Sequence, residues 1–260
     1  MQEKIFVISL GGSVAVPEEI NTSFLKRFSK IIKEEVKKGR KFFIVIGGGK
    51  TSRKYQKALS EISKSSNEEK DWIGIKATEL NSLLLKAVFN KMANPVIFDR
   101  RFKIKKFGEY PVIIGCGWKP GWSTDFISVQ IAADFKVDKI INLGKPAYVY
   151  ADNVEELHSS SPFVPYSSEA KSEKELRSLP HGTRVFEKNS KAKPLENISW
   201  RDYFKLIPRK WRPGLSAPID PIAARLAKRN KIQAIVAFGE DLENFKKILA
   251  GKKFKGTLIS

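Results

Sequence analysis

Cysteine, histidine and long apolar runs are almost missing from this chain. Cys116 is the single cysteine among 260 residues, so no disulfide can form within the chain, and a reducing cytoplasm is the expected location. No apolar run approaches the length of a membrane span, and the first residues carry no signal-peptide core. The two histidines, His158 and His181, are interpreted as surface residues rather than metal ligands. These absences predict a soluble protein without disulfides or a protein-built metal site.

Acidic residues are few compared with basic ones. The chain has 28 Asp and Glu residues against 48 Lys and Arg, which gives a net charge of +20. Such a balance favours an anionic partner: nucleic acid, a membrane surface or a small anionic substrate. The lysines are spread along the chain, however, and no block alternates them with aromatic residues. We therefore expect a solvated basic surface that suits small anions, with neither nucleic acid nor membrane as a partner.

Strand-like and helix-like segments alternate along the chain. The apolar runs that indicate strands are Lys4–Leu10, Lys41–Ile46, Val112–Cys116, Lys139–Leu143 and Ile232–Phe238. Amphipathic spacing follows most of them, as in a mostly parallel sheet with helices on both faces. The fold class predicted for residues 1–260 is α/β, a three-layer αβα sandwich in a single domain, with ligands at the carboxyl ends of the strands.

Four further assignments are less regular. Pro95–Phe98 is predicted as a strand, Gly256–Ile259 as a final edge strand, and Ser60–Glu69 as a surface loop. Asp71 is predicted to cap a long helix that buries Ala77, Leu80, Leu84 and Val88.

Regular patterning is lost between about residues 155 and 193. Serine, proline and lysine dominate this stretch, which offers little periodic apolar surface. It is too long for a plain connection. We predict an insertion that acts as a lid, forms an interface or is disordered, and that folding does not require.

The stretch from Val112 to Asp134 carries the strongest local signal. A buried strand ends in glycines, and Ser123, Thr124 and Asp125 then begin a helix on which Ile127 and Ile131 share one face. Backbone N–H groups at a helix start lack intrahelical partners and the helix dipole favours anions, so this junction could bind phosphate. A capped turn without a ligand is the equally weighted alternative.

Two other strands also end in glycines. Gly11-Gly12-Ser13 follows the first strand, and Gly47-Gly48-Gly49-Lys50 follows the second and leads into a helix with Arg53. Glycines let a ligand approach the backbone, and Lys50 and Arg53, three residues apart, can both reach it. A tight turn before a solvated basic helix is the alternative.

Five segments together resemble the amino-acid kinase superfamily, and within it the archaeal type of uridylate (UMP) kinase. In chain order they are Gly11-Gly12-Ser13, Gly47-Gly48-Gly49-Lys50 with Arg53-Lys54-Tyr55, Asp71-Trp72-Ile73-Gly74-Ile75, Pro120-Gly121-Trp122-Ser123-Thr124-Asp125, and Ser216-Ala217-Pro218-Ile219-Asp220-Pro221 with Ala223-Ala224. The resemblance implies ATP and Mg²⁺ as cofactors, nucleotide substrates, and a homo-oligomer that is a hexamer. It also implies an acceptor-binding half, about 1–135, and a nucleotide-binding half, about 136–260.

The resemblance also assigns site residues. It implies that UMP contacts Gly48, Asp71 and the segment Trp118, Lys119, Pro120, Gly121, Trp122, Ser123 and Thr124. It implies that ATP contacts Gly12, Ser13, Gly49, Arg53, Asn142, Tyr148 and Asp152. Asp125 would organise the catalytic basic groups, for which Lys50 and Arg53 are the candidates.

The chain departs from the family pattern at three places. The family segment G-G-T-H-P-G-H-T-T-D has Trp118, Lys119, Trp122 and Ser123 at its variable positions, and Ser9 stands where many members have a lysine. The nucleotide segment between residues 143 and 153 is also altered and one residue longer. The tryptophans are predicted either to stack on the acceptor base or to pack as apolar mass.

The leading hypothesis is ATP-dependent phosphorylation of UMP to UDP, in pyrimidine nucleotide synthesis. The alternatives are a catalytically weak member that binds nucleotide, a kinase for another small phosphate or carboxylate acceptor, and a nucleic-acid-binding protein suggested by charge alone.

Overall fold

A central sheet of seven strands organises the protein. The computed structural model describes residues 4–151, 192–209 and 217–260. The strands lie in the order β3-β2-β1-β4-β8-β9-β7, and all run parallel except β9 and β7, which run opposite to the other five. Their bounds are β1 Ile5–Leu10, β2 Lys41–Ile46, β3 Val112–Gly115, β4 Lys139–Gly144, β8 Gln233–Phe238, β9 Thr257–Ile259 and β7 Asn197–Ile198. A separate hairpin pairs β5 (Val149–Ala151) with β6 (Lys193–Leu195).

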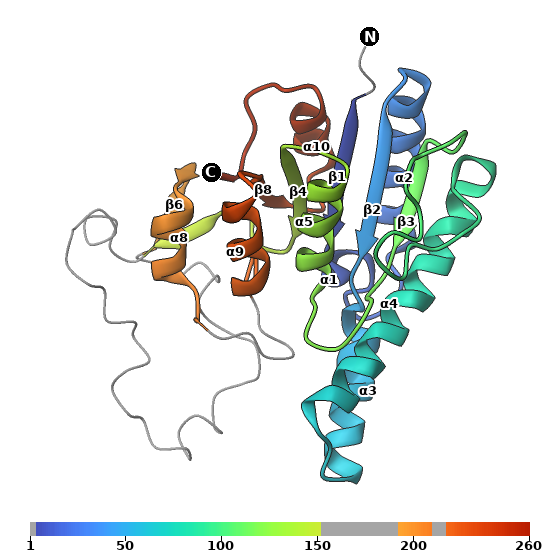
Figure 1. Ribbon diagram of the computed structural model, residues 1–260, viewed down its shortest axis with the longest axis vertical. Coiled ribbons are helices and arrows are strands. Elements are labelled where there is room, and N and C mark those ends of the chain that lie inside the picture. Colours follow the sequence, from blue (N-terminus) through green and yellow to red (C-terminus); the bar gives the residue numbers. More distant parts are fainter. Residues whose placement is uncertain (1–3, 152–191, 210–216) are drawn as a thin grey trace.

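Helices cover both faces of the sheet (Figure 1). The helices are α1 Gly12–Ala15, α2 Thr22–Lys37, α3 Gly49–Ile62, α4 Asn67–Phe89, α5 Thr124–Asp134, α8 Trp200–Leu206, α9 Pro221–Arg229 and α10 Leu242–Leu249, with a 3-10 turn at Asn90–Met92. One core cluster joins α5, α8 and α9 to the sheet, and the other joins α1, α2, α10 and the end of α4 to the opposite face. The predicted three-layer α/β sandwich is confirmed.

Alternation along the strands explains the two cores. In β2, Phe42, Ile44 and Ile46 enter one cluster, whereas Phe43 and Val45 enter the other. Successive side chains of a strand point to opposite faces, so a strand buried on both sides reads as a continuous apolar run. This is why the strands were readable from the sequence.

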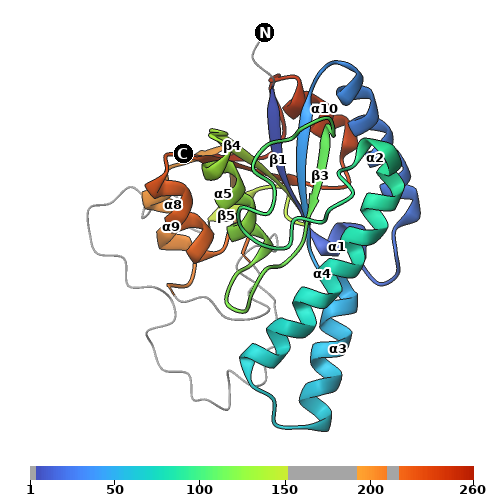
Figure 2. The ribbon, with the colours of Figure 1, turned by 45° about the vertical axis from the view of Figure 1, so that its right-hand side comes forward.

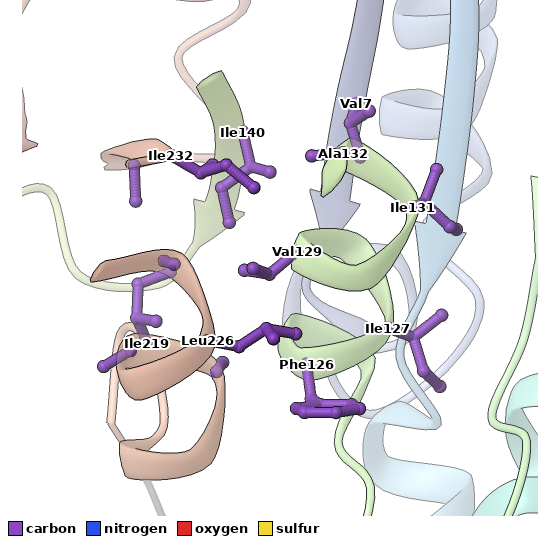
Figure 3. Close-up of a cluster of buried hydrophobic side chains, with 14 of the residues drawn as sticks. Val7, Phe126, Ile127, Val129, Ile131, Ala132, Ile140, Ile219, Leu226 and Ile232 are labelled. Atoms are coloured by element: carbon purple, nitrogen blue, oxygen red, sulfur yellow. The ribbon is translucent and has the colours of Figure 1, made fainter. Parts of the chain in front are cut away.

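Helix α5 is buried almost all round rather than on one face. Figure 3 shows Ile127 and Ile131 directed at the sheet and Val129 directed at α9, where Leu226 and Ile219 lie. Ser128 and Gln130 are buried as well. The amphipathic pattern expected for this helix is therefore wrong, because α9 covers the side that the sheet leaves open.

Helices α3 and α4 form an antiparallel pair that extends beyond the carboxyl ends of the strands (Figure 2). Their connection is short: α3 continues to Ile62, and α4 begins after Ser66. Ser66 and Glu69 form a reciprocal capping box, each side chain bonding the other's backbone N–H. The loop predicted over Ser60–Glu69 is wrong for most of its length because this cap starts the helix early.

Two predicted strands differ from the structure. Pro95–Phe98 forms only an isolated bridge from Phe98 to Gly115, because Pro95 has no N–H and the Asn94 side chain accepts from Val96 N. Strand β9 was expected at the sheet edge, but β7 pairs outside it. The predicted insertion lies outside the described residues except at its end, where Lys193 begins β6.

Candidate active site

The carboxyl ends of β2, β1 and β4 meet at one point of the sheet. Gly47 N donates to Leu10 O at 2.9 Å, and Gly11 N donates to Leu143 O at 2.8 Å. From β1 the chain winds outward through β2 and β3, then returns to place β4 on the other side of β1. Such a reversal leaves a crevice at the carboxyl ends of the two central strands, where α/β proteins bind ligands.

The two glycine turns are in direct backbone contact. A Cβ atom on Gly12 would lie 2.1 Å from Gly49 N, and one on Gly47 would lie 2.6 Å from Gly12 N. Gly49 also has a φ of +64°, which side-chain-bearing residues rarely adopt. Glycine is thus required here for the approach of β1 to β2, whatever ligand binds.

We expect Gly12→Ala to destabilise the protein by about 3 kcal/mol, because the added methyl group forces the two strand tips apart. Turnover should fall with it. Urea unfolding measures the stability, and Gly144→Ala at the same edge is the control, since its Cβ would meet no atom closer than 3.2 Å. A Gly12→Ala protein as stable and active as the parent would show that the contact is dispensable.

Basic side chains project from the start of α3. Lys50 Nζ donates to Glu18 Oε1 at 2.8 Å, and Lys54 Nζ lies 3.7 Å from Glu19 Oε1. Arg53 forms no ion pair within the described part of the chain. Partial burial lowers the pKa of Arg53, and the nearby Glu18 carboxylate opposes that shift. Arg53 is therefore the cation with the fewest competing partners at this edge.

Ser123 has two roles at the start of α5. Its Oγ accepts from Phe126 N at 3.0 Å, so Ser123 is the helix cap, as predicted. The same hydroxyl donates to Asp220 Oδ2, while Asp220 Oδ1 accepts from Ile222 N at 2.8 Å and caps α9. The hydroxyl thereby joins the starts of two helices.

Asp125 lies in the first turn of α5 and receives polar but uncharged donors. Ser9 Oγ and Asn142 Nδ2 both donate to Asp125 Oδ1 at 2.8 Å. Among the described residues no lysine or arginine lies within 4.0 Å of its carboxylate. The predicted role of organising cationic groups therefore has no counterpart in these contacts, because Ser9 occupies the place of the usual lysine.

Two carboxylates share this buried corner. Burial and the charge of Asp220 raise the pKa of Asp125 to about 7, despite the donors Ser9, Asn142 and the Asp220 backbone. Burial also raises the pKa of Asp220, which Ser123 and the N–H groups of Ala223 and Ile222 oppose. Because Asp220 is the better solvated by donors, we expect Asp125 to hold the proton when only one is bound.

Asp71 connects α4 to the loop that precedes α5. It sits inside α4, which Ser66 caps, so the predicted capping role of Asp71 is wrong. Its Oδ2 accepts from Gly121 N at 2.8 Å, at the Pro120-Gly121 turn, where Gly121 has a φ of +82°. Burial raises the pKa of Asp71 and this hydrogen bond opposes it. Asp71 therefore sets the position of the loop from Trp118 to Ser123.

The two tryptophans of this loop have different environments. Trp118 is 9% exposed, stacks edge-on against Phe98 and donates from Nε1 to Phe98 O at 3.0 Å. It is apolar mass in the core, which was the alternative to base stacking. Trp122 is half-buried against Phe126, and Lys119 Nζ lies 4.2 Å from its ring centroid. Only Trp122 and Lys119 remain at the surface of the loop.

The residues expected to bind ATP are placed unequally. Ser13 lies in α1 beside Gly12, Asn142 is committed to Asp125, and Tyr148 stands next to β5 with its ring 6.2 Å from that of Tyr150. Asp152 lies outside the described residues. Gly48 precedes α3, and Thr124 is the first residue of α5.

Sequence reasoning missed a set of buried polar residues on α4. Asn81 donates to Gly47 O at 2.8 Å, Ser82 donates to Gly115 O at 2.9 Å, and Thr78 accepts from Gly117 N at 2.7 Å. They hold the tips of β2 and β3. The predicted apolar face was wrong, since Leu80 is 60% exposed. Polar residues three and four apart inside an apolar helix were the available signal.

Ser9 and Asp220 were also given no role, although both contact the acidic corner. The signal for Asp220 was its place directly before Pro221, since an aspartate before a proline at the first helical position is typical of a helix start. No sequence pattern indicated that its second oxygen would reach Ser123.

Comparison with known proteins agrees with this geometry. Residues 4–160 match the model of the Amino acid kinase family. Uridylate kinase from Archaeoglobus fulgidus is 31% identical over 98% of this chain and 99% of its own, and that from Pyrococcus abyssi is 29% identical over 97% and 98%. The crystal structure of the Archaeoglobus fulgidus enzyme aligns with a TM-score of 0.68 over 99% of this chain and 100% of its own. UMP kinase from Bacillus anthracis, 22% identical with a TM-score of 0.71, shares the fold over 99% and 96% of the two chains.

The family model covers more than half of the chain, and its range holds both glycine turns, the start of α5 and Asp125. The resemblance inferred from five short segments is therefore confirmed: this chain belongs to the amino acid kinase family.

Proposed function

We propose that this protein transfers the terminal phosphoryl group of ATP to UMP. The observation that carries the proposal is the match to uridylate kinases along nearly the whole length of both chains. The geometry supports it, because glycine turns and helix starts gather at the reversal point of the sheet. Phosphoryl transfer asks a protein mainly to align two substrates and neutralise charge, and no covalent nucleophile is needed. Cys116 is unsuited to be one, since burial raises the pKa of its thiol to about 12.

The proposed division of labour follows the two sides of the crevice. The acceptor half, about 1–135, would bind UMP through Gly48, Asp71 and the loop with Lys119 and Trp122. The remainder, about 136–260, would bind ATP, with Gly12, Ser13 and Gly49 contributing from the shared edge. Arg53 and Lys50 would neutralise the phosphates as charge moves between them. The hydroxyls and backbone N–H groups at the start of α5 would hold the transferred group in line.

A Mg²⁺ ion is compatible with the acidic corner. Asp125 and Asp220 supply hard oxygen donors, and magnesium typically binds one or two carboxylates together with phosphates and water. Among the described residues no group of three or more His, Cys, Asp or Glu side chains could hold a metal alone. When bound with nucleotide, the ion would neutralise phosphate charge.

We further propose a cytoplasmic homo-oligomer, a hexamer by the family resemblance, that acts in pyrimidine nucleotide synthesis. Exposed apolar side chains on α4, namely Trp72, Leu80 and Leu83, support self-association. No described helix is long and apolar enough to cross a membrane.

The alternatives remain a member that binds nucleotide without efficient transfer, and a kinase for another small phosphate or carboxylate. The first is favoured by the absence of a cationic contact at Asp125 among the described residues. Release of ADP from ATP with UMP, CMP, AMP and small carboxylates as acceptors decides between them. Fastest turnover with UMP supports the proposal, and nucleotide binding without turnover of any acceptor contradicts it.

Trp122→Ala should raise the KM for UMP about tenfold while changing the KM for ATP little. A base stacked on an aromatic ring gains roughly 1–3 kcal/mol, and stacking tolerates different bases, so some CMP should also be accepted. Trp118→Phe is the matched control, because Trp118 is buried and should affect stability more than acceptor binding. Equal changes in the two KM values of Trp122→Ala would remove Trp122 from the acceptor site.

A further inference from the structure

Basic residues that are dispersed in the sequence gather at one edge of the folded sheet. Parallel strands begin at the same edge, so the segments that lead into them lie together, opposite the candidate active site (Figure 1). Each segment that reaches this amino edge carries exposed lysine. Representatives, one per segment, are Lys4, Lys37, Lys106, Lys136, Lys231 and Lys253.

Hydrogen bonds between the strand starts fix these segments side by side. Lys41 N donates to Lys4 O at 3.1 Å, and Phe42 N donates to Pro111 O at 2.8 Å. Gln233 N donates to Asp138 O at 2.8 Å, which brings the segments with Lys136 and Lys231 together. The loop after α10, which holds Lys253, arches over the top of the molecule in Figure 1, near the start of β1.

Unfavourable backbone conformations concentrate at the same edge. Four described non-glycine residues have positive φ: Asn90, Phe102, Lys136 and Lys231. Asparagine tolerates this region, whereas phenylalanine and lysine do not. Lys136 and Lys231 follow the ends of α5 and α9, where glycine is the usual residue. The chain therefore keeps two cations and one aromatic ring at positions that suit glycine better.

Phe102 places an aromatic ring within this basic edge. It is 59% exposed, and it lies in the segment Arg100–Lys106, in which five of the seven residues are basic. Arg101 binds Asp134 through two hydrogen bonds of 2.9 and 2.6 Å, which ties the segment to the end of α5, two residues before Lys136. Arg101 also lies 4.4 Å from the Phe102 ring centroid. The ring is held in place beside the lysines.

Helix dipoles explain only part of this pattern. Basic residues are favoured at the carboxyl ends of helices, which accounts for Lys37. Lys106 and Lys253 lie in loops. The nearby acids Glu35 and Asp134 are already paired, Glu35 with Lys38 and Arg40 and Asp134 with Arg101. The edge therefore retains a net positive charge.

We propose that this amino edge is a binding surface for single-stranded nucleic acid. A row of cations that follows a phosphate backbone, with an exposed aromatic ring on which a base can stack, is the combination such strands require. An anionic membrane fits less well, because Phe102 is the one large exposed apolar side chain in the described part of this edge, and a single ring offers little to insert. The surface is separate from the candidate active site and does not depend on the proposed kinase activity.

Glycine substitutions test the surface without weakening the fold. Lys136→Gly/Lys231→Gly and Phe102→Gly remove the side chains and relieve the backbone, so the Tm should be unchanged or a few degrees higher. The probe is a fluorescein-labelled oligoadenylate RNA of about 20 nucleotides, and the readout is fluorescence anisotropy at increasing KCl. We expect micromolar binding by the parent near 100 mM KCl, as is usual for binding without sequence preference.

The lysine pair should weaken binding about tenfold and lower the slope of log K against log [KCl] by about 1. Phe102→Gly should weaken it about fivefold with the slope unchanged. The matched control, Lys57→Ala/Lys64→Ala, removes equal charge from the α3–α4 pair and should change little. Arg53→Ala should also leave RNA binding intact. Absence of binding by the parent, equal weakening by the control pair, or binding to phosphatidylserine vesicles but not to RNA would each overturn the proposal.

Discussion

Asp125→Asn is expected to lower kcat/KM with UMP about a hundredfold or more and, at pH 8, to make the protein more stable. The two effects have one cause. The carboxylate lies in a buried corner beside Asp220, where its charge is unfavourable for folding but available when charge develops during transfer. Asparagine keeps the acceptor for Ser9 and Asn142 and removes the charge.

The direction of the pH effect follows from the raised pKa. Asp125 has a pKa of about 7 in the folded protein against 3.8 for the unperturbed group. Between these values the folded state holds a proton that the unfolded state has lost, so stability falls as pH rises from about 4 to 7. Asp125→Asn cannot titrate and should lack this decline. At pH 8 its free energy of unfolding should exceed that of the parent by about 2–4 kcal/mol.

Urea unfolding at pH 5 and pH 8 measures the difference, and the pH profile of kcat/KM gives a second readout. The parent should gain activity through pH 7 as Asp125 ionises, and Asp125→Asn should lack that limb. Asp220→Asn is the matched variant: it removes the neighbouring charge, so the limb should move to lower pH. An Asp125→Asn protein that loses UMP binding and turnover equally, or that is less stable at pH 8, would contradict this role.

The sheet was predictable because burial on both faces leaves a direct mark on the sequence. Continuous apolar runs such as Phe42–Ile46 have no other explanation in a polar chain, and glycines mark where these runs end. The helices with one buried face, such as α2 and α10, were equally clear. Pattern failed where a helix meets something other than an apolar face. Helix α4 buries Thr78, Asn81 and Ser82 because exposed strand tips need hydrogen bonds there, and no periodicity rule encodes that need.

The site was partly predictable for a similar reason. Local signals gave the Ser123 cap and the glycine turns, because their conformations depend on neighbours in sequence. Contacts between distant segments were not accessible: Asp71 to Gly121 spans 50 residues, and Ser123 to Asp220 spans 97. The buried packing of Trp118 depends likewise on Phe98, which comes from another element. Charge was misjudged because dispersal along the chain says nothing about which strand starts lie side by side.

Arg53→Ala is expected to reduce kcat/KM by about 10- to 100-fold without changing the free energy of unfolding. A charge-assisted hydrogen bond to phosphate contributes roughly 1.5–3 kcal/mol, which corresponds to that range. Arg53 is better placed than Lys50 for this contact, because Lys50 is engaged by Glu18 at 2.8 Å whereas Arg53 has no ion pair in the described residues. Its side chain makes no described contact that the fold would lose.

Neighbouring residues provide the controls for Arg53. Lys54→Ala removes the same charge one position further along α3, where the lysine lies near Glu19, and should keep at least half of the activity. Arg53→Lys should be intermediate, because lysine keeps the charge but cannot make a bidentate contact with phosphate. If Lys54→Ala loses as much activity as Arg53→Ala, the effect is one of general electrostatic attraction, and raising the salt concentration should then diminish both losses. A loss confined to Arg53 and insensitive to salt identifies a direct contact with the transferred phosphate, on the side of the crevice where the glycine turn of β2 begins α3.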